Sequence, residues 1–164
     1  MWQTLPNSAC ELGESPFWHP HEQSLYWIDI PGRTVLRTRG AIGGEVQRWV
    51  LDEEPGCIAP ARRGGLVLAL RSGIYRAHEW GGALQLLAPA DYDTRTMRFN
   101  DGKCDPLGRF WAGTLNETKD RANATLYCLD ARGSRPPVVT AMANHATTAN
   151  GLAFGAESDT LYWA

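Results

Sequence analysis

A short motif occurs twice in the chain, and its recurrence limits the fold more than any other feature. One copy, ESPFWHPHEQSLYWI, begins at Glu14, and the other, NGLAFGAESDTLYWA, begins at Asn150. Each runs from a polar residue through an aromatic one to a polar turn and closes on Leu-Tyr-Trp. Two weaker copies begin at Cys57 and Asn100, so successive copies start 43, 43 and 50 residues apart. A fixed period of this length is typical of repeat architectures.

Each copy predicts a β-hairpin, because its two apolar runs flank a turn rich in Gly, Pro or acidic residues. Two further strand-like runs follow each of the first three hairpins, at residues 34–38 and 46–50, 73–77 and 84–87, and 125–130 and 137–141. Four short strands in every unit of about 40 to 50 residues predict an all-β fold, a β-propeller built of blades. A β-sandwich is the alternative, but it does not require one motif to recur at the same phase.

Composition excludes several other classes of protein. Lys and Arg total 16 and Asp and Glu total 18, so the net charge is −2. With no block of like charge, we expect neither a nucleic acid nor a membrane as partner. No signal peptide and no apolar run of about 18 residues is visible, which favours a cytoplasmic protein. The four cysteines lack C-x-x-C spacing, so we expect buried or half-buried free thiols.

The phase of the repeat predicts where polar residues meet. The first strand of each propeller blade lines the central channel, so equivalent residues of different blades surround one axis. Glu14, Asn100 and Asn150 are then expected to be neighbours, although they are far apart in the sequence. A carboxylate and two amide oxygens suit Ca²⁺, Mg²⁺ or Mn²⁺, with Zn²⁺ as a further option. The alternative is that each residue only caps a strand or a turn.

Several motifs together resemble one protein family. They are Gly13-Glu14-Ser15-Pro16, RFNDGK at residues 98–103 followed by Asp105-Pro106, Ala112-Gly113-Thr114 and Asn150-Gly151-Leu152. From about Glu11 to the last residue, the chain resembles the SMP-30/gluconolactonase/regucalcin (LRE-like) family. The resemblance implies a six-bladed β-propeller that holds one divalent metal on its axis and hydrolyses sugar lactones. Residues 1–164 would then form a single propeller domain, truncated at the C-terminus after roughly three and a half blades.

The resemblance also implies roles for individual residues. Glu14 and Asn150 correspond to metal ligands, and Arg98 and Asn100 correspond to substrate contacts. The family's third ligand, an aspartate that acts as general base, is expected beyond residue 164, so no catalytic residue is assigned within this chain. The register of a further substrate-binding carboxylate in the family falls on Thr118, with Glu117 beside it.

The function predicted in this way is a metal-dependent hydrolase that opens a small sugar lactone. The metal would act as Lewis acid on the lactone carbonyl, with water as nucleophile, and the activity would be incomplete in this chain. The alternative is a non-catalytic calcium-binding propeller that binds a partner. We also expect that an exposed blade face could support self-association. None of the four histidines falls at the axial phase, and His145 precedes Asn150 by only a short loop.

Overall fold

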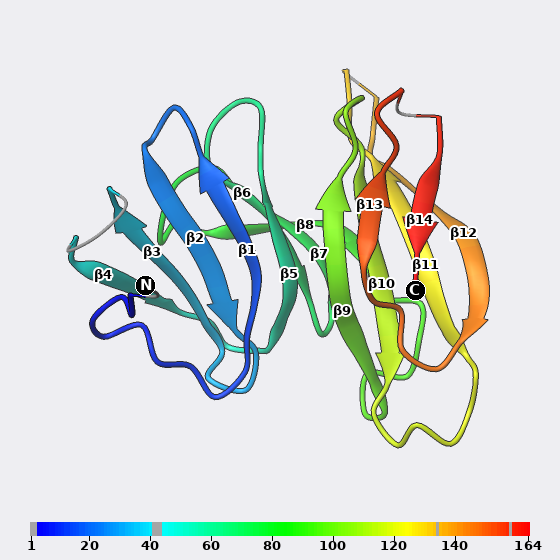
Figure 1. The fold of residues 1–164 in the computed structure, drawn as a ribbon. Coiled ribbons are helices and arrows are strands. Elements are labelled where there is room, and N and C mark those ends of the chain that lie inside the picture. The colour runs from blue at the N-terminus through cyan, green and yellow to red at the C-terminus, as the bar shows by residue number, and fades with distance from the viewer. Residues whose placement is uncertain (1–2, 41–43, 134, 158) are drawn as a thin grey trace.

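The chain folds into a series of antiparallel sheets, as Figure 1 shows. The computed structural model describes residues 3–40, 44–133, 135–157 and 159–164, and the regular elements in these ranges are all β-strands. Three sheets have four strands each, and a final hairpin has two. The strands are β1 (Gly13–His19), β2 (Ser24–Asp29), β3 (Thr34–Arg39), β4 (Val46–Val50), β5 (Pro55–Pro60), β6 (Leu66–Leu70), β7 (Gly73–Ala77), β8 (Leu84–Pro89), β9 (Met97–Cys104), β10 (Phe110–Asn116), β11 (Ala124–Asp130), β12 (Val138–Ala146), β13 (Leu152–Phe154) and β14 (Leu161–Trp163).

The order of strands within each sheet follows the sequence, which is the arrangement of a propeller blade. β1 to β4, β5 to β8 and β9 to β12 form successive blades, and β13 pairs with β14 in the next unit. The first strands β1, β5, β9 and β13 contact one another in turn, so the same edge of every sheet faces the common axis. This confirms the propeller fold predicted from the repeat.

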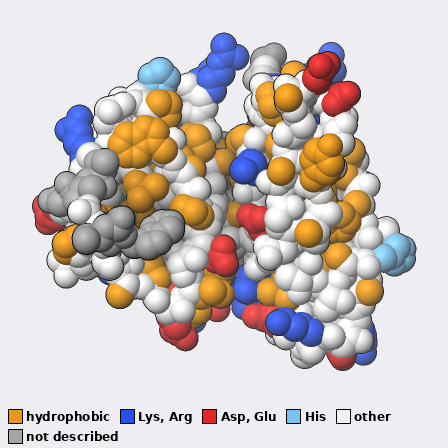
Figure 2. All heavy atoms as spheres, viewed as in Figure 1, with side chains coloured by type: hydrophobic (Ala, Val, Ile, Leu, Met, Phe, Trp, Pro, Cys, Tyr) orange, Lys and Arg blue, Asp and Glu red, His pale blue; other side chains and the backbone are white. Residues whose placement is uncertain are grey.

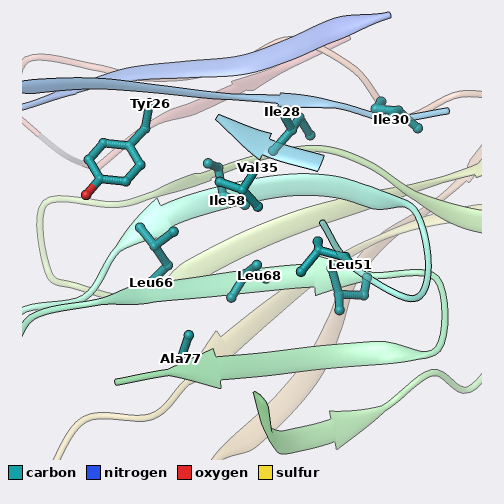
Figure 3. Close-up of a cluster of buried hydrophobic side chains, with 10 residues drawn as sticks. Tyr26, Ile28, Ile30, Val35, Leu51, Ile58, Leu66, Leu68 and Ala77 are labelled. Atoms are coloured by element: carbon teal, nitrogen blue, oxygen red, sulfur yellow. The ribbon is translucent and has the colours of Figure 1, made fainter. Parts of the chain in front are cut away.

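Apolar side chains pack between successive blades rather than within any one of them. One buried cluster joins the first blade to the second, and Figure 3 shows Ile28 and Val35 facing Ile58 and Leu68. A second cluster joins the second and third blades through Ala69 and other residues. A third lies between the third blade and the final hairpin. Alternation along each strand thus supplies apolar residues to both faces of a blade, as stacked sheets require.

Shortening a side chain in the first of these clusters should therefore cost stability. Ile28 is 0% exposed, and we expect Ile28→Val to lower the free energy of unfolding by about 1 kcal/mol, since it removes one buried methylene. Val50 is 73% exposed, so Val50→Ala, the control, should change it by less than about 0.5 kcal/mol. Urea unfolding monitored by tryptophan fluorescence measures both. Equal effects of the two substitutions would contradict the packing between blades.

Two expectations from composition can be compared with the structure directly. All four cysteines are free; Cys57 and Cys128 are buried, and Cys10 and Cys104 are half-buried, as predicted. Within the described ranges, no helix has the length and apolar character that a membrane crossing would need.

Candidate functional site

A small pocket lies where the inner strands approach the axis. Its lining comprises Glu14, Gly56, Asn100, Asp101 and Asn150. These residues come from β1, β5, β9 and the segment before β13, so three blades and the final hairpin contribute. The structure thus brings together the three polar residues that share a phase in the repeat. In Figure 2, acidic and basic side chains lie along the depression between the β1–β5 side and the β9–β13 side of the molecule.

A bulge in β1 positions Glu14. The register with β2 shifts between Glu14 and Phe17, and Ser15 has a φ of 52°. Left-handed backbone is uncommon for a residue other than glycine, and the bulge turns the strand locally. The Ser15 hydroxyl accepts a hydrogen bond from the Ile58 backbone N–H at 3.0 Å. This contact ties the bulge to β5 and fixes the strand at the point where Glu14 projects.

Backbone contacts hold Asn150 at the start of the last hairpin. Its N–H donates to the Ala164 carbonyl at 2.7 Å, and the Ala164 N–H donates back at 2.9 Å. The preceding residue, Ala149, donates to the Thr114 carbonyl at 2.9 Å. This close approach requires Gly113, because a Cβ there would lie 2.4 Å from that of Ala149. The Ala112-Gly113-Thr114 stretch of β10 therefore packs against the loop that carries Asn150 and supports it.

In the second blade the pocket is lined by Gly56 and not by Cys57, the residue aligned with Glu14 in the repeat. The register of β5 shifts between Pro55 and Cys57, and this irregularity moves the axial position by one residue. Cys57 is instead fully buried, and burial raises the pKa of its thiol well above the ordinary value. A Cβ at Gly56 would lie 2.3 Å from the Phe99 carbonyl oxygen, so only glycine allows β5 to lie this close to β9.

Asn100 links the pocket to Arg98. Its side-chain oxygen accepts a hydrogen bond from Nη1 of Arg98 at 3.1 Å. Its amide nitrogen donates to the Ala149 carbonyl at 3.1 Å and to Oδ1 of Asn150 at 3.4 Å. Each of the two amide oxygens, that of Asn100 and that of Asn150, accepts one hydrogen bond and keeps a second lone pair, so these bonds orient the two side chains relative to each other.

The lining of the pocket is acidic. Glu14 and Asp101 are both among its lining residues, and neither makes an ion pair with another described residue within 4.0 Å. The Asp101 carboxylate accepts a hydrogen bond from the Gly102 N–H at 2.8 Å, and the residue also lines the pocket. Carboxylate and amide oxygens are the ligand types that a divalent cation such as Ca²⁺ or Mg²⁺ prefers, so the residue types of this lining suit such an ion.

Clusters of three or more His, Cys, Asp or Glu side chains with metal-binding spacing are absent from the described part of the chain. The candidate centre therefore depends on amide oxygens as well as carboxylates. For this reason the phase of the repeat predicts the site, whereas a search for clustered acidic residues does not. The histidines do not line the pocket.

Arg98 lies beside the pocket with only 11% of its side chain exposed. Burial lowers the pKa of this guanidinium, while the nearby Glu117 carboxylate acts in the opposite direction. The Nε of Arg98 lies 3.8 Å from Oε1 of Glu117. Thr118, at the register of the family's further carboxylate, instead donates its hydroxyl to Asn116 at 2.9 Å. Glu117 is thus the carboxylate next to Arg98, and the sequence alone did not assign it a role.

Comparison with known proteins identifies a family for this chain. Residues 12–164 match the model of the SMP-30/gluconolactonase/LRE-like region. A 6-deoxy-6-sulfogluconolactonase of Pseudomonas putida is 44% identical over 144 residues, which cover 87% of this chain and 47% of that protein. Regucalcin of Sus scrofa is 36% identical over 127 residues, covering 74% of this chain and 42% of the relative. The chain spans about half the length of the curated relatives it matches.

Solved structures show the same fold. The crystal structure of a calcium-binding protein, regucalcin, from Agrobacterium tumefaciens superposes with a TM-score of 0.83 at 24% identity. The match covers 94% of this chain and 50% of that one. At this identity the likeness concerns the fold alone.

Proposed function

The chain belongs to the SMP-30/gluconolactonase/LRE-like family. On this premise we propose that it contributes metal-binding and substrate-binding residues to a hydrolase that opens sugar lactones. In this proposal Glu14 and Asn150 hold one divalent cation, and Arg98 and Asn100 bind the substrate. The cation is Ca²⁺, Zn²⁺, Mg²⁺ or Mn²⁺, all of which accept oxygen ligands. When bound, it supplies Lewis acidity toward the lactone carbonyl and lowers the pKa of a bound water.

The residues of this chain would bind and orient the substrate. Arg98 offers a planar set of donors that can contact several oxygens of a sugar lactone at once. Its hydrogen bond to Asn100 fixes the guanidinium relative to the pocket. Asn100 in turn contacts Asn150, so the substrate contacts and the proposed metal ligand form one connected set. The general base remains a prediction for a residue outside this chain.

One observation carries the proposal: acidic and amide residues from separate blades line the same pocket beside a largely buried arginine. A purely structural metal site would not need Arg98 next to it. A non-catalytic calcium-binding propeller is therefore the less favoured alternative. The two readings differ in whether a lactone is turned over.

Hydrolysis of glucono-δ-lactone tests the proposal most directly. Acid release would be followed with a pH indicator and corrected for spontaneous opening, using the longest natural chain that contains these residues. We expect hydrolysis that EDTA abolishes and that one of the four cations restores. A second substrate, 6-deoxy-6-sulfogluconolactone, is included because the 44% identical relative is named for it. Metal binding without turnover of either lactone would favour the non-catalytic alternative, and turnover unaffected by EDTA would contradict the metal mechanism.

A further inference from the structure

Arg71 occupies the junction between the second and third blades, outside every motif of the repeat. It follows β6, and its guanidinium makes five hydrogen bonds. Nε donates to Glu54 at 2.8 Å, and two parallel bonds at 3.0 and 2.8 Å reach the two oxygens of Glu117. The remaining bonds go to the carbonyls of Thr94, at 2.9 Å, and Met97, at 3.3 Å. Each of the three guanidinium nitrogens thus has at least one protein partner.

These bonds fix the surroundings of Arg98 from two sides. Met97, whose carbonyl accepts from Arg71, directly precedes Arg98 in β9. Glu117, held in bidentate fashion, places one oxygen 3.8 Å from the Nε of Arg98. Bidentate arginine–carboxylate pairs define orientation as well as energy. The chain of contacts therefore runs from Glu54 through Arg71 and Glu117 to Arg98.

The electrostatics agree with a fixed network. The hydrogen bonds from Arg71 hold the pKa of Glu117 below its usual value. Burial alone would raise the pKa of Glu54, but the bond from Arg71 and its other partners bring it below the ordinary value. The pKa of Arg71 is raised, chiefly by its bond to Glu117. Glu117 accepts hydrogen bonds from Arg71 on both oxygens, at 3.0 and 2.8 Å, so it meets Arg98 as an ion pair at 3.8 Å and not through a hydrogen bond.

We propose that Arg71 is a positioning residue for the substrate-binding arginine: by holding Glu117 and the Met97 carbonyl, it fixes the Arg98 guanidinium in the orientation that contacts Asn100. This inference rests on the function proposed above for Arg98. It assigns no contact between Arg71 and the substrate, because Arg71 does not line the pocket. It predicts that the effect of Arg71 on substrate binding passes through Arg98 and leaves the metal ligands unaffected.

Arg71→Met tests this role, since methionine retains an unbranched apolar stem and removes every donor. We expect kcat/KM for the lactone to fall about tenfold, mainly through KM, because a misplaced binding group loses productive orientation. The divalent-metal Kd should stay within about twofold, as expected for sites without shared partners. Arg71→Lys should not restore kcat/KM, because an ammonium cannot form the bidentate pair. Arg76→Met is the matched control: Arg76 lies in neighbouring β7, and among the described residues its guanidinium donates only to the Leu66 and Gly64 carbonyls.

A double-mutant cycle separates positioning from a general structural role. In the Arg98→Ala background, Arg71→Met should cause no further loss of kcat/KM, since the group that it positions is gone. A full additional loss in that background, or a fall in metal affinity equal to the fall in kcat/KM, would overturn the proposal.

A measurement independent of turnover keeps the inference testable if the protein does not hydrolyse lactones. The Nε–Hε resonance of Arg98, assigned by its loss in Arg98→Lys, should change position in Arg71→Met and remain unchanged in Arg76→Met. An Arg98 resonance identical in all three proteins would show that Arg71 does not position it. If no lactone is turned over but the Arg98 resonance shifts as expected, the proposed function is refuted. The claim that Arg71 positions Arg98 would still hold.

Discussion

Replacing Glu14 by glutamine is expected to weaken divalent-metal binding by about a hundredfold or more. Loss of an outer partner of a metal ligand typically costs about 10–100-fold in affinity, and the loss of a ligand charge should cost at least as much. Glu14 is exposed and has no ion-pair partner among the described residues, so the substitution opens no cavity. Calorimetric titration with Ca²⁺, Mg²⁺, Mn²⁺ and Zn²⁺ measures the change in Kd, and the melting temperature without metal should stay the same.

Glu11→Gln is the matched control for that substitution. It removes the same charge from the same exposed segment, three residues earlier, but Glu11 does not line the pocket. Long-range attraction alone would make both substitutions weaken binding by a similar small factor, and salt would screen it. An unchanged Kd for Glu14→Gln would exclude Glu14 from the metal centre. Equal losses in both variants would reduce its role to general electrostatics.

The strands were predictable because their signals are local. Residues 46–50 and 73–77 were predicted as strands and coincide with β4 and β7, since polar turns bound short apolar runs on both sides. The last strand of the third blade was predicted at 137–141 but extends over Val138–Ala146. Its side chains are mostly exposed, so no alternation marks its end. Pairing with β11, with two register shifts, defines this strand instead.

The approach of Glu14, Asn100 and Asn150 to one pocket was also predictable, because the repeat period carries information over long sequence distances. The repeat phase does not give the axial residue of the second blade, because an irregularity in β5 places Gly56 and not Cys57 at the pocket. A shift of one residue exchanges the two faces of a strand, and no residue type in the motif signals it. The roles assigned to Glu14, Asn150, Arg98 and Asn100 stay predictions until they are measured.

The network around Arg71 had no signal in the sequence. Arg71 and Glu117 are 46 residues apart, and they follow different strands in different blades. Neither belongs to a recurring motif, and only the packing of adjacent blades brings them together. A repeat predicts which residues occupy equivalent positions in different blades. This ion-pair network instead joins residues at non-equivalent positions. Residues that support a site are therefore harder to predict than the residues that line it.

Arg98→Ala is expected to lower kcat/KM for the lactone by about 10–100-fold while leaving the metal Kd within about twofold. A hydrogen bond to a charged group contributes about 1.5–3 kcal/mol, and about 1.4 kcal/mol corresponds to a factor of ten. The metal should be little affected because Arg98 contacts the Asn100 oxygen and not Glu14 or Asn150. Steady-state kinetics and calorimetric titration of the same preparation measure the two quantities.

Arg98→Lys distinguishes charge from geometry at this position. Lysine keeps the positive charge but lacks the planar fork, so it cannot bind Asn100 and several substrate oxygens together. The fall in kcat/KM caused by Arg98→Ala can be expressed as a free energy. We therefore expect Arg98→Lys to recover less than half of that free energy. Full recovery would mean that charge alone binds the substrate, and the orientation set by Glu117 and Arg71 would then be irrelevant. Equal losses in kcat/KM and in metal affinity would instead make Arg98 a structural support of the metal centre, because its removal would have disturbed Asn100 and, through it, Asn150.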